Sequence, residues 1–542
     1  QSGKVLTVLH RANALGGRRI KPVAHPNVFQ TYRLFFLGQQ SQAEEQKQNN
    51  RRLTCFQHTI FVRLRVENRN ILSSKERFRS IQDEDLRFFG DCLGSEYVAT
   101  DGESRDRFSH DETEDLRFAP EVVVKPANAG EIAKLLAYCN AHYLPVTVSG
   151  ARTGLSGGAL PVEGGVALST ERLNRIIAID ERNLQATVEP GVINQVFHEA
   201  CREKGLFYPP DPSSWGSSFL GGNLALNAGG PKAVKYGVTN AYVLDLEVVL
   251  ANGEIIRTAA KTLKNSTGYN LTQLMVGSEG TLGVITQAVF RLLPYPRHNR
   301  LMLLPFASAE EACACVSAVF QAGITPSGME FMERDAIDYT LQFVSDVNLP
   351  IAEEVQAHLL VEVDGNHPNI LLEDCTRIAE IAEAYGVGEV LFAESASEKA
   401  ALWKLRRKVG EAVKAHSVYK EEDTVVPRAE LAKLLRGVKE IGRRYGFQSV
   451  CYGHAGDGNL HVNIIKGALS QEQWDKELPQ GIREIFKLVK QLGGTISGEH
   501  GIGWVQKEYL DLVFSPAEIA LQKAIKATFD PHGILNPGKV FP

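Results

Sequence analysis

Two histidines stand symmetrically about an Asp-Gly pair in the stretch CYGHAGDGNLHVNI, which begins at Cys451. An Asp-Gly pair between alternating apolar residues predicts a two-residue hairpin turn, with Asp457 and Gly458 at its tip. Counting outward from that tip places His454 directly opposite His461, with their Cβ atoms roughly 5 Å apart. Two imidazoles at that separation can share one metal ion, so we expect a metal site on this hairpin.

The strand after the turn predicts a further polar group at the same place. Its apolar residues alternate with His461 and Asn463. Alternate residues of a strand point to the same face, so Asn463 is expected on the face of His461.

A second glycine-rich stretch, GTISGEHGIG, begins at Gly494 and contains an acidic residue beside a histidine. Glycines let the backbone come close to another group. His454, His461 and Glu499 would form a set of three protein ligands that leaves one metal position open for a substrate. His500 would remain free as an acid or base. One histidine alone is more often a core or loop residue, but four polar groups in two glycine-rich loops favour a site.

The bulk composition limits the class of protein. At 542 residues the chain is too long for one core, so two or three domains are expected. A net charge of -5 with mixed signs gives no basic stripe for nucleic acid. No apolar run approaches the roughly 18 residues of a membrane span. The eight cysteines form no CxxC pair, which argues against iron-sulfur or structural zinc sites and favours a cytoplasmic, reducing compartment.

Residues 1–85 differ from the rest of the chain and predict a poorly ordered extension. No acidic residue precedes Glu44, and a Gln/Asn-rich run occupies 39–50. The acid-free, arginine-bearing start resembles a transit peptide, whereas the missing initiator methionine equally suits a truncated or over-extended chain start. We assign no function to this part and expect order to begin near Ser109.

Glycine-rich turns dominate the next part of the chain. Residues 121–149 predict strand, helix and strand, with Asn128 as the helix N-cap. The loop SGARTGLSGG at 149–158 follows directly, and its backbone N–H groups could wrap a pyrophosphate. Similar turns lie in PPDPS, GGNLALNAGG and GSEGTLGVIT, and Asn252-Gly253 predicts a hairpin. A long, extended ligand would explain these turns, and a β-rich domain with many tight turns is the alternative.

The order of these motifs resembles a known family. TGLSGG, PPDPSS, GGNLALNAGG, GSEGTLGVIT, GHAGDGNLHVN, SGEHGIG and NPGKV follow the order found in flavin-linked D-2-hydroxy-acid dehydrogenases of the vanillyl-alcohol-oxidase type. That group includes D-lactate dehydrogenases, the glycolate oxidase flavin subunit and D-2-hydroxyglutarate dehydrogenase. The resemblance implies an α+β fold, with a PCMH-type FAD-binding domain at 86–297. A ferredoxin-like FAD-linked oxidase C-terminal substrate domain would follow at 298–542, its last segment returning to the flavin.

The resemblance also implies that FAD binds non-covalently. Some family members attach FAD through a histidine in the pyrophosphate loop, and this loop has none. Arg152 stands where the family usually has a small residue, so its side chain would either contact a phosphate or point to solvent. The implied FAD-contacting residues are Gly150, Ala151, Arg152, Thr153, Gly154, Leu155, Ser156, Gly157, Pro210, Asp211, Ser213, Gly221, Asn223, Gly229, Glu279, Gly280, Gly283, Ile285 and Asn536.

The substrate carboxylates would be held by cations of the second domain. A helical arginine is most often solvated, but the resemblance implies that Arg406, on a helix expected over 400–415, binds a carboxylate, as a guanidinium can do bidentately. Lys420 matches a second cationic clamp. Gly410 replaces a threonine of dicarboxylate-binding relatives, and the spacing to Lys420 is one residue shorter. These departures favour a smaller or monocarboxylic acid.

Together these features predict oxidation of a D-2-hydroxy acid of the D-lactate, glycolate or D-2-hydroxyglutarate class to the 2-oxo acid. A zinc-like divalent ion on the three metal ligands would lower the pKa of the hydroxyl, and His500 would take its proton. Arg406, Lys420 and Asn463 would fix the carboxylates while hydride passes to FAD.

Two other functions fit parts of the pattern. A metal-dependent hydrolase would use the same ligands, but it leaves the glycine-rich first half unexplained. An electron-transfer flavoprotein subunit would bind FAD without turnover of its own. The expected partners are a small 2-hydroxy acid and an electron acceptor whose identity the sequence leaves open, as it does a homodimer.

Overall fold

The computed structural model describes residues 77–113, 116–347 and 349–542. They belong to one structural unit that begins at Ser74. Residues 1–76, most of the predicted N-terminal extension, lie outside the described residues. Helix α4 (Asp83–Leu93) buries Phe89 in a hydrophobic core, so the expectation that order begins near Ser109 is wrong. The predicted boundary at residue 85 falls inside this helix.

A four-stranded sheet in the order β1-β2-β4-β3 opens the first half of this unit. The strand, helix and strand predicted over 121–149 are confirmed, and Asn128 caps helix α6 (Ala129–Ala141). β2 and β3 both pair in parallel with β4, so the loop at 150–158 leaves the carboxyl end of β3. The strands are β1 (Val98–Ala99), β2 (Val122–Val124), β3 (Val146–Ser149) and β4 (Val166–Ser169), and the short helix α5 (Gly102–Arg107) follows β1.

A five-stranded antiparallel sheet in the order β5-β6-β10-β8-β9 completes this half. Asn252 and Gly253 connect β8 to β9 as predicted, and Gly253 has a φ of +85°, which favours glycine. The strands are β5 (Ile176–Asp180), β6 (Gln185–Val188), β8 (Val243–Val249), β9 (Ile255–Arg257) and β10 (Val284–Arg291). The helices are α7 (Asn194–Glu203), α8 (Leu220–Leu226), α9 (Ala233–Tyr236) and α10 (Leu271–Met275), and β7 (Leu206–Phe207) pairs with β11 (Leu293–Pro294).

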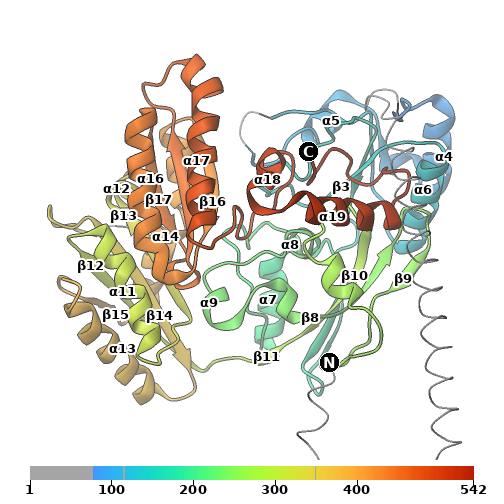
Figure 1. The fold of residues 1–542 in the computed structure, drawn as a ribbon. Coiled ribbons are helices and arrows are strands. Elements are labelled where there is room, and N and C mark those ends of the chain that lie inside the picture. Colours follow the sequence, from blue (N-terminus) through green and yellow to red (C-terminus); the bar gives the residue numbers. More distant parts are fainter. Residues whose placement is uncertain (1–76, 114–115, 348) are drawn as a thin grey trace, which may run out of the picture. The chain divides into compact units, whose positions relative to one another are not determined.

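A seven-stranded antiparallel sheet, in the order β15-β12-β14-β13-β17-β18-β16, organises the second half (Figure 1). The first four of these strands along the chain, β12 to β15, lie in the sheet in the order β15-β12-β14-β13. This 4-1-3-2 order is the predicted ferredoxin-like arrangement. β17, β18 and β16 extend it at one edge. The strands are β12 (His298–Phe306), β13 (Gly328–Glu333), β14 (Ala357–Gly365), β15 (Leu391–Ala393), β16 (Tyr419–Val425), β17 (Gln448–Gly453) and β18 (Asn459–Ile465).

Helices cover both faces of this sheet. One core joins it to α11 (Ala309–Gln321), α13 (Pro368–Glu383), α16 (Leu431–Tyr445) and α17 (Leu478–Gln491). A separate core joins the opposite face to α12 (Arg334–Phe343), α14 (Ala396–Arg407) and α15 (Val409–His416). The helix predicted over 400–415 is therefore two helices that meet at Lys408.

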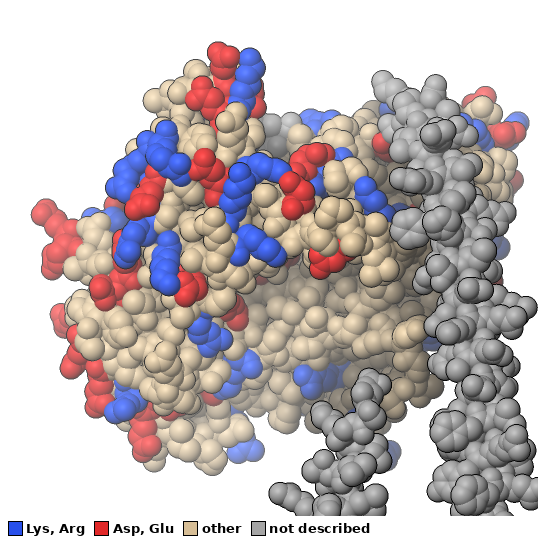
Figure 2. Space-filling model, in the orientation of Figure 1, with Lys and Arg blue, Asp and Glu red and all other residues tan. Residues whose placement is uncertain are grey.

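The end of the chain returns to the first half. After α18 (Leu510–Val513) and α19 (Pro516–Phe529), Leu535 pairs with Val146 of β3 and lies in the core of the first sheet. On the face drawn in Figure 2, basic and acidic side chains are interspersed. Within the described part of the chain, no helix has the length and apolar character that a membrane crossing requires.

Candidate active site

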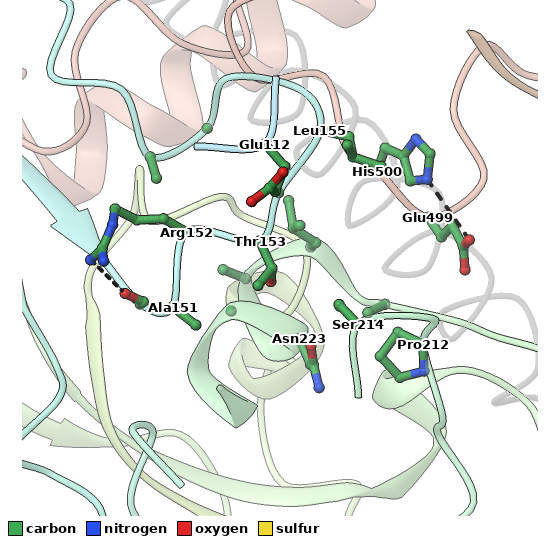
Figure 3. Close-up of a pocket in the computed structure, with 18 of the residues that line it drawn as sticks. Glu112, Ala151, Arg152, Thr153, Leu155, Pro212, Ser214, Asn223, Glu499 and His500 are labelled. Carbon is green, nitrogen blue, oxygen red and sulfur yellow. Dashed lines mark hydrogen bonds and ion pairs between the residues drawn. The ribbon is translucent and has the colours of Figure 1, made fainter. Parts of the chain in front are cut away.

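A cavity of about 710 Å³ is lined by the glycine-rich loops of the first half and by the α14 and α15 face of the second sheet. Figure 3 shows Arg152, Thr153 and Asn223 on one side of it and Glu499 and His500 on the other. The predicted FAD-contacting residues that line it are Gly150, Ala151, Arg152, Thr153, Gly154, Leu155, Ser156, Ser213, Gly221, Asn223, Glu279, Gly280, Gly283 and Ile285. The remaining ones, which do not line it, are Gly157, Pro210, Asp211, Gly229 and Asn536.

Two of these outlying residues support the cavity wall from behind. The Asn536 side chain donates to the carbonyls of Gly158 (3.0 Å) and Glu279 (2.7 Å), which ties the end of the chain to two wall segments. Asp211 accepts from the backbone N–H of Lys232 at 3.0 Å. Burial chiefly raises the pKa of Asp211, to about 6, although Arg407 opposes this.

The cavity fits an extended cofactor with many backbone contacts. A Cβ on Gly154 or Gly222 would meet no heavy atom within 4 Å, so both glycines border open space. The buried amide nitrogen of Asn223 has no hydrogen-bond partner among the described residues and can donate to a ligand. Arg152 has a φ of +61°, which explains why a small residue suits this position. Its guanidinium packs on the Phe108 ring, 4.3 Å from the ring centroid.

The hairpin that carries the histidines has a different register from the predicted one. Tyr452, not His454, lies opposite His461, because a 3-10 turn (Ala455–Asp457) lengthens the connection between β17 and β18. Gly458 is pressed against the backbone of Val426, and its carbonyl accepts from the Val426 N–H at 3.0 Å. This tertiary contact overrides the local preference for a two-residue turn.

The two imidazoles nevertheless come together, with ring centroids 5.4 Å apart. His454 Nε2 lies 3.2 Å and His461 Nε2 lies 3.6 Å from Glu499 Oε1. Bonds of about 2.1 Å in a tetrahedral site would separate ligand atoms by ~3.4 Å, so these spacings fit a divalent ion. Glu421, His461 and His500 form a second group of that kind, which shares His461 with the first.

His454 has a carboxylate hydrogen-bonded to its outer nitrogen, as metal-binding histidines usually do, whereas the outer nitrogen of His461 makes no hydrogen bond to its nearby carboxylates. Both oxygens of Glu330 lie 2.9 Å from His454 Nδ1. Glu421 lies 3.4 Å and Asp423 lies 3.7 Å from His461 Nδ1. Burial lowers the pKa of His461 to about 3, which leaves its ring neutral and able to bind a metal.

Asp423 also holds the loop that carries the other functional groups. One of its oxygens accepts from the backbone N–H groups of Gly498 (2.7 Å), Glu499 (2.7 Å) and His500 (3.0 Å) and from the Ser497 hydroxyl (3.0 Å). Burial opposes ionisation, but the nearby histidines and these N–H groups hold the pKa of Asp423 below its usual value. The carboxylate therefore fixes the backbone of the loop from below the site.

His500 lies in the cavity wall between the proposed metal ligands and the loop at 150–158 (Figure 3). Its ring stacks on His461 with centroids 5.2 Å apart, and its carbonyl accepts from the Ser156 hydroxyl at 2.8 Å. Burial disfavours the charged imidazole, but Asp423, Glu421 and Glu499 outweigh it and raise the pKa of His500. A proton acceptor at this place lies beside the metal ligands and the cavity.

The structure brings only one of the three predicted carboxylate-binding residues to the cavity. Arg406 is buried there, its Nη2 pairs with Glu330 at 2.7 Å, and its Nε has no partner among the described residues. Lys420 lies on the other face of β16, with its ammonium 5.3 Å from the centroid of the Trp474 ring. Asn463 is fully buried two residues beyond His461 and does not line the cavity.

Glu421 takes the place in the cavity wall that Lys420 was expected to fill. Because neighbouring strand residues point to opposite faces, one residue of spacing decides which side chain enters the site. Glu421, Glu422 and Asp423 form a run of three acids that the prediction did not use, and this run alone does not show which strand face meets the cavity. Glu330 belongs to no such run.

Two family models match this sequence. The FAD binding domain matches residues 120–259, and the C-terminal domain of FAD linked oxidases matches residues 295–540. The glycolate oxidase subunit GlcD of Bacillus subtilis is 40% identical over 80% of this chain and 92% of its own length. The D-lactate dehydrogenase of Archaeoglobus fulgidus is 39% identical over 80% of this chain and 95% of its own.

The chain belongs to this family of FAD-linked oxidoreductases. A more distant relative, the D-2-hydroxyglutarate dehydrogenase of Stutzerimonas stutzeri, is 33% identical over 82% of this chain and 96% of its own length. As an FAD-dependent oxidoreductase, the protein is not the metal-dependent hydrolase that the ligand set alone would allow.

Solved structures confirm the α+β fold of this family. The structure of p-cresol methylhydroxylase with substrate bound has a TM-score of 0.70 at 16% identity and covers 87% of this chain and 98% of its own. The 4-ethylphenol oxidase of Gulosibacter chungangensis has a TM-score of 0.67 at 19% identity and covers 85% of this chain and 98% of its own. At these identities the likeness concerns the fold alone.

Proposed function

We propose that this protein oxidises a small D-2-hydroxy acid to the 2-oxo acid, with non-covalent FAD as the hydride acceptor and a divalent ion, zinc in the first instance, as a second cofactor. The observation that carries the proposal is the convergence of a cofactor wall, a group of three candidate metal ligands of which His461 and Glu499 line the cavity, a further histidine and a buried arginine. The relatives named after glycolate, D-lactate and D-2-hydroxyglutarate support this substrate class.

Each of these side chains would have a separate role in the reaction. Arg406 binds the substrate carboxylate through the N–H groups that Glu330 does not use. His454, His461 and Glu499 hold the divalent ion, which polarises the 2-hydroxyl when bound. His500 accepts the hydroxyl proton, and its position beside the Ser156 loop keeps it near the cofactor wall. FAD, when bound in the cavity, would supply the acceptor for the hydride that leaves C2.

A substrate with one carboxylate suits this cavity best. A second carboxylate would meet Glu421 in the wall where a cation was expected, while Lys420 lies on the other face of the strand. Burial already raises the pKa of Glu421, so a second carboxylate beside it would have to be accommodated against a buried acid that has no cation within ion-pair distance among the described residues. D-Lactate or glycolate therefore fits better than D-2-hydroxyglutarate. A complete set of catalytic groups also favours turnover over the electron-transfer function.

Metal removal tests the proposal. We expect the FAD-loaded protein to lose flavin reduction by its acid substrate after treatment with a chelator and to regain it with Zn²⁺, Mn²⁺ or Co²⁺. Anaerobic stopped-flow absorbance of the flavin measures the rate. Reduction that continues unchanged in metal-free protein would contradict the role given to the metal ligands.

A further inference from the structure

Glu330 is a buried carboxylate that contacts two of the groups assigned above. It lies on β13, and its side chain is almost completely inaccessible to solvent. Its oxygens are 2.9 Å from His454 Nδ1, and Oε2 is also 2.7 Å from Arg406 Nη2. One carboxylate thus joins a proposed metal ligand on the β17–β18 connection to the carboxylate-binding arginine on α14.

We propose that Glu330 is a positioning residue that sets His454 and Arg406 at a fixed separation, so that metal and substrate carboxylate are aligned by one buried anion. The inference rests on the proposed function, because it needs the divalent ion on His454. Glu330 does not line the cavity and would not touch the substrate.

The contact with His454 fixes the orientation of that ring. Carboxylate oxygens only accept hydrogen bonds, so His454 Nδ1 must donate to Glu330, and Nε2 is the ring atom that faces the other proposed metal ligands. Nε2 faces Glu499 Oε1 at 3.2 Å, the next ligand of the set. By the same reasoning the Nε2–H donates to Glu499 while no metal is bound, so a metal ion would displace that proton from a ring that Glu330 has already oriented.

The ion pair with Arg406 places one end of the guanidinium beside Glu330. Its Nη2 is held by Glu330, and its Cζ lies 5.1 Å from the centroid of the Tyr452 ring. Arg406 Nε has no partner among the described residues, which leaves donors for a carboxylate in the cavity. Without the ion pair, this buried cation would lose its only described carboxylate partner.

A glutamine at position 330 keeps the shape but cannot serve both partners. Its single carbonyl oxygen can face Arg406, and its NH₂ group then faces His454 Nδ1, where two donors meet. The ring would relieve this by moving its proton to Nε2, the atom that must bind the metal. The Glu330→Gln variant should therefore weaken metal binding and substrate binding together.

The matched control is Glu333→Gln on the same strand. Glu333 is also a buried carboxylate, but it binds Lys439 Nζ at 2.7 Å and the Cys451 N–H at 2.6 Å, away from the cavity. This substitution removes a buried negative charge from β13 without touching either proposed partner of Glu330. It separates a positioning role from a general loss of stability.

The experiment compares FAD-loaded wild type, Glu330→Gln, Glu330→Asp and Glu333→Gln. Zn²⁺ affinity is measured by competition with a chelator on metal-stripped protein, and KM and kcat are measured for the acid that reduces the wild-type flavin. We expect Glu330→Gln to bind Zn²⁺ about 10- to 100-fold more weakly and to raise KM, while Glu333→Gln changes neither. Glu330→Asp, which is too short to reach both partners, should show the same pattern if the glutamine variant does not fold.

The outcomes separate the two proposals. Wild-type protein that binds no Zn²⁺ overturns the metal part of the proposed function and this inference with it. Wild type that binds Zn²⁺, with Glu330 variants of unchanged Zn²⁺ affinity and KM, overturns the inference alone. Equal effects in the Glu330 and Glu333 variants also overturn it, since they would show a structural role only.

Discussion

Asp423 offers the sharpest test of how the site is held, because one buried oxygen supports the loop with Glu499 and His500. Replacement by asparagine keeps the size and removes the charge. The other oxygen of Asp423 accepts from the Asn459 amide at 2.7 Å, so the new NH₂ group must face either that donor or the loop N–H groups. A donor then opposes a donor in either orientation.

The structure gives a magnitude for this change. A hydrogen bond to a charged group contributes about 1 kcal/mol more than one between neutral groups, and three backbone N–H groups are affected. We therefore expect Asp423→Asn to lower the free energy of unfolding by about 3 kcal/mol. A shift of roughly 1 Å in the loop would slow flavin reduction about 100-fold.

Urea unfolding and anaerobic stopped-flow flavin reduction measure the two effects. Glu422→Gln is the control, because Glu422 is an adjacent buried acid whose side chain accepts from Gln506 instead of the loop. Flavin reduction in Asp423→Asn at the wild-type rate, or slowed no more than in Glu422→Gln, would refute the supporting role of Asp423.

Three other substitutions test the assignment of individual side chains. His500→Ala should keep its FAD but reduce it about 100-fold more slowly or worse, because the proton acceptor is lost; unchanged single-turnover kinetics would remove His500 from the mechanism. Arg406→Ala should raise KM at least 10-fold, since a charge-assisted bond to the substrate is lost, whereas Lys420→Ala should leave KM within about twofold; steady-state kinetics that show the reverse order would restore Lys420 as the clamp. Glu421→Gln should raise kcat/KM for D-2-hydroxyglutarate relative to D-lactate, and an unchanged ratio would show that Glu421 does not select against a second carboxylate.

The sequence was enough to predict which side chains form the candidate metal site. The proposed metal ligands His454, His461 and Glu499 lie together as expected, and their role as ligands stays a prediction. The turn geometry was not predictable, because the contact between Gly458 and Val426 is made across strands that lie apart in the sequence.

The alternation of side chains along a strand explains why Lys420 was wrongly expected to line the cavity. Lys420 and Glu421 are neighbours, and only the pairing of β16 with β18 shows that Glu421 shares the face of His461. Glu330 was hidden for another reason. Its role depends on His454 and Arg406, which reach it from segments far away in the chain, and its own strand carries no recognisable motif.

An anaerobic visible spectrum of the FAD-loaded protein tests the central claim most directly. The protein is titrated in turn with D-lactate, glycolate, D-malate and D-2-hydroxyglutarate, before and after removal of metal by a chelator. We predict that a monocarboxylic D-2-hydroxy acid bleaches the flavin and that chelation abolishes the bleaching. A flavin that none of these acids bleaches would contradict the account and would favour an electron-transfer function instead.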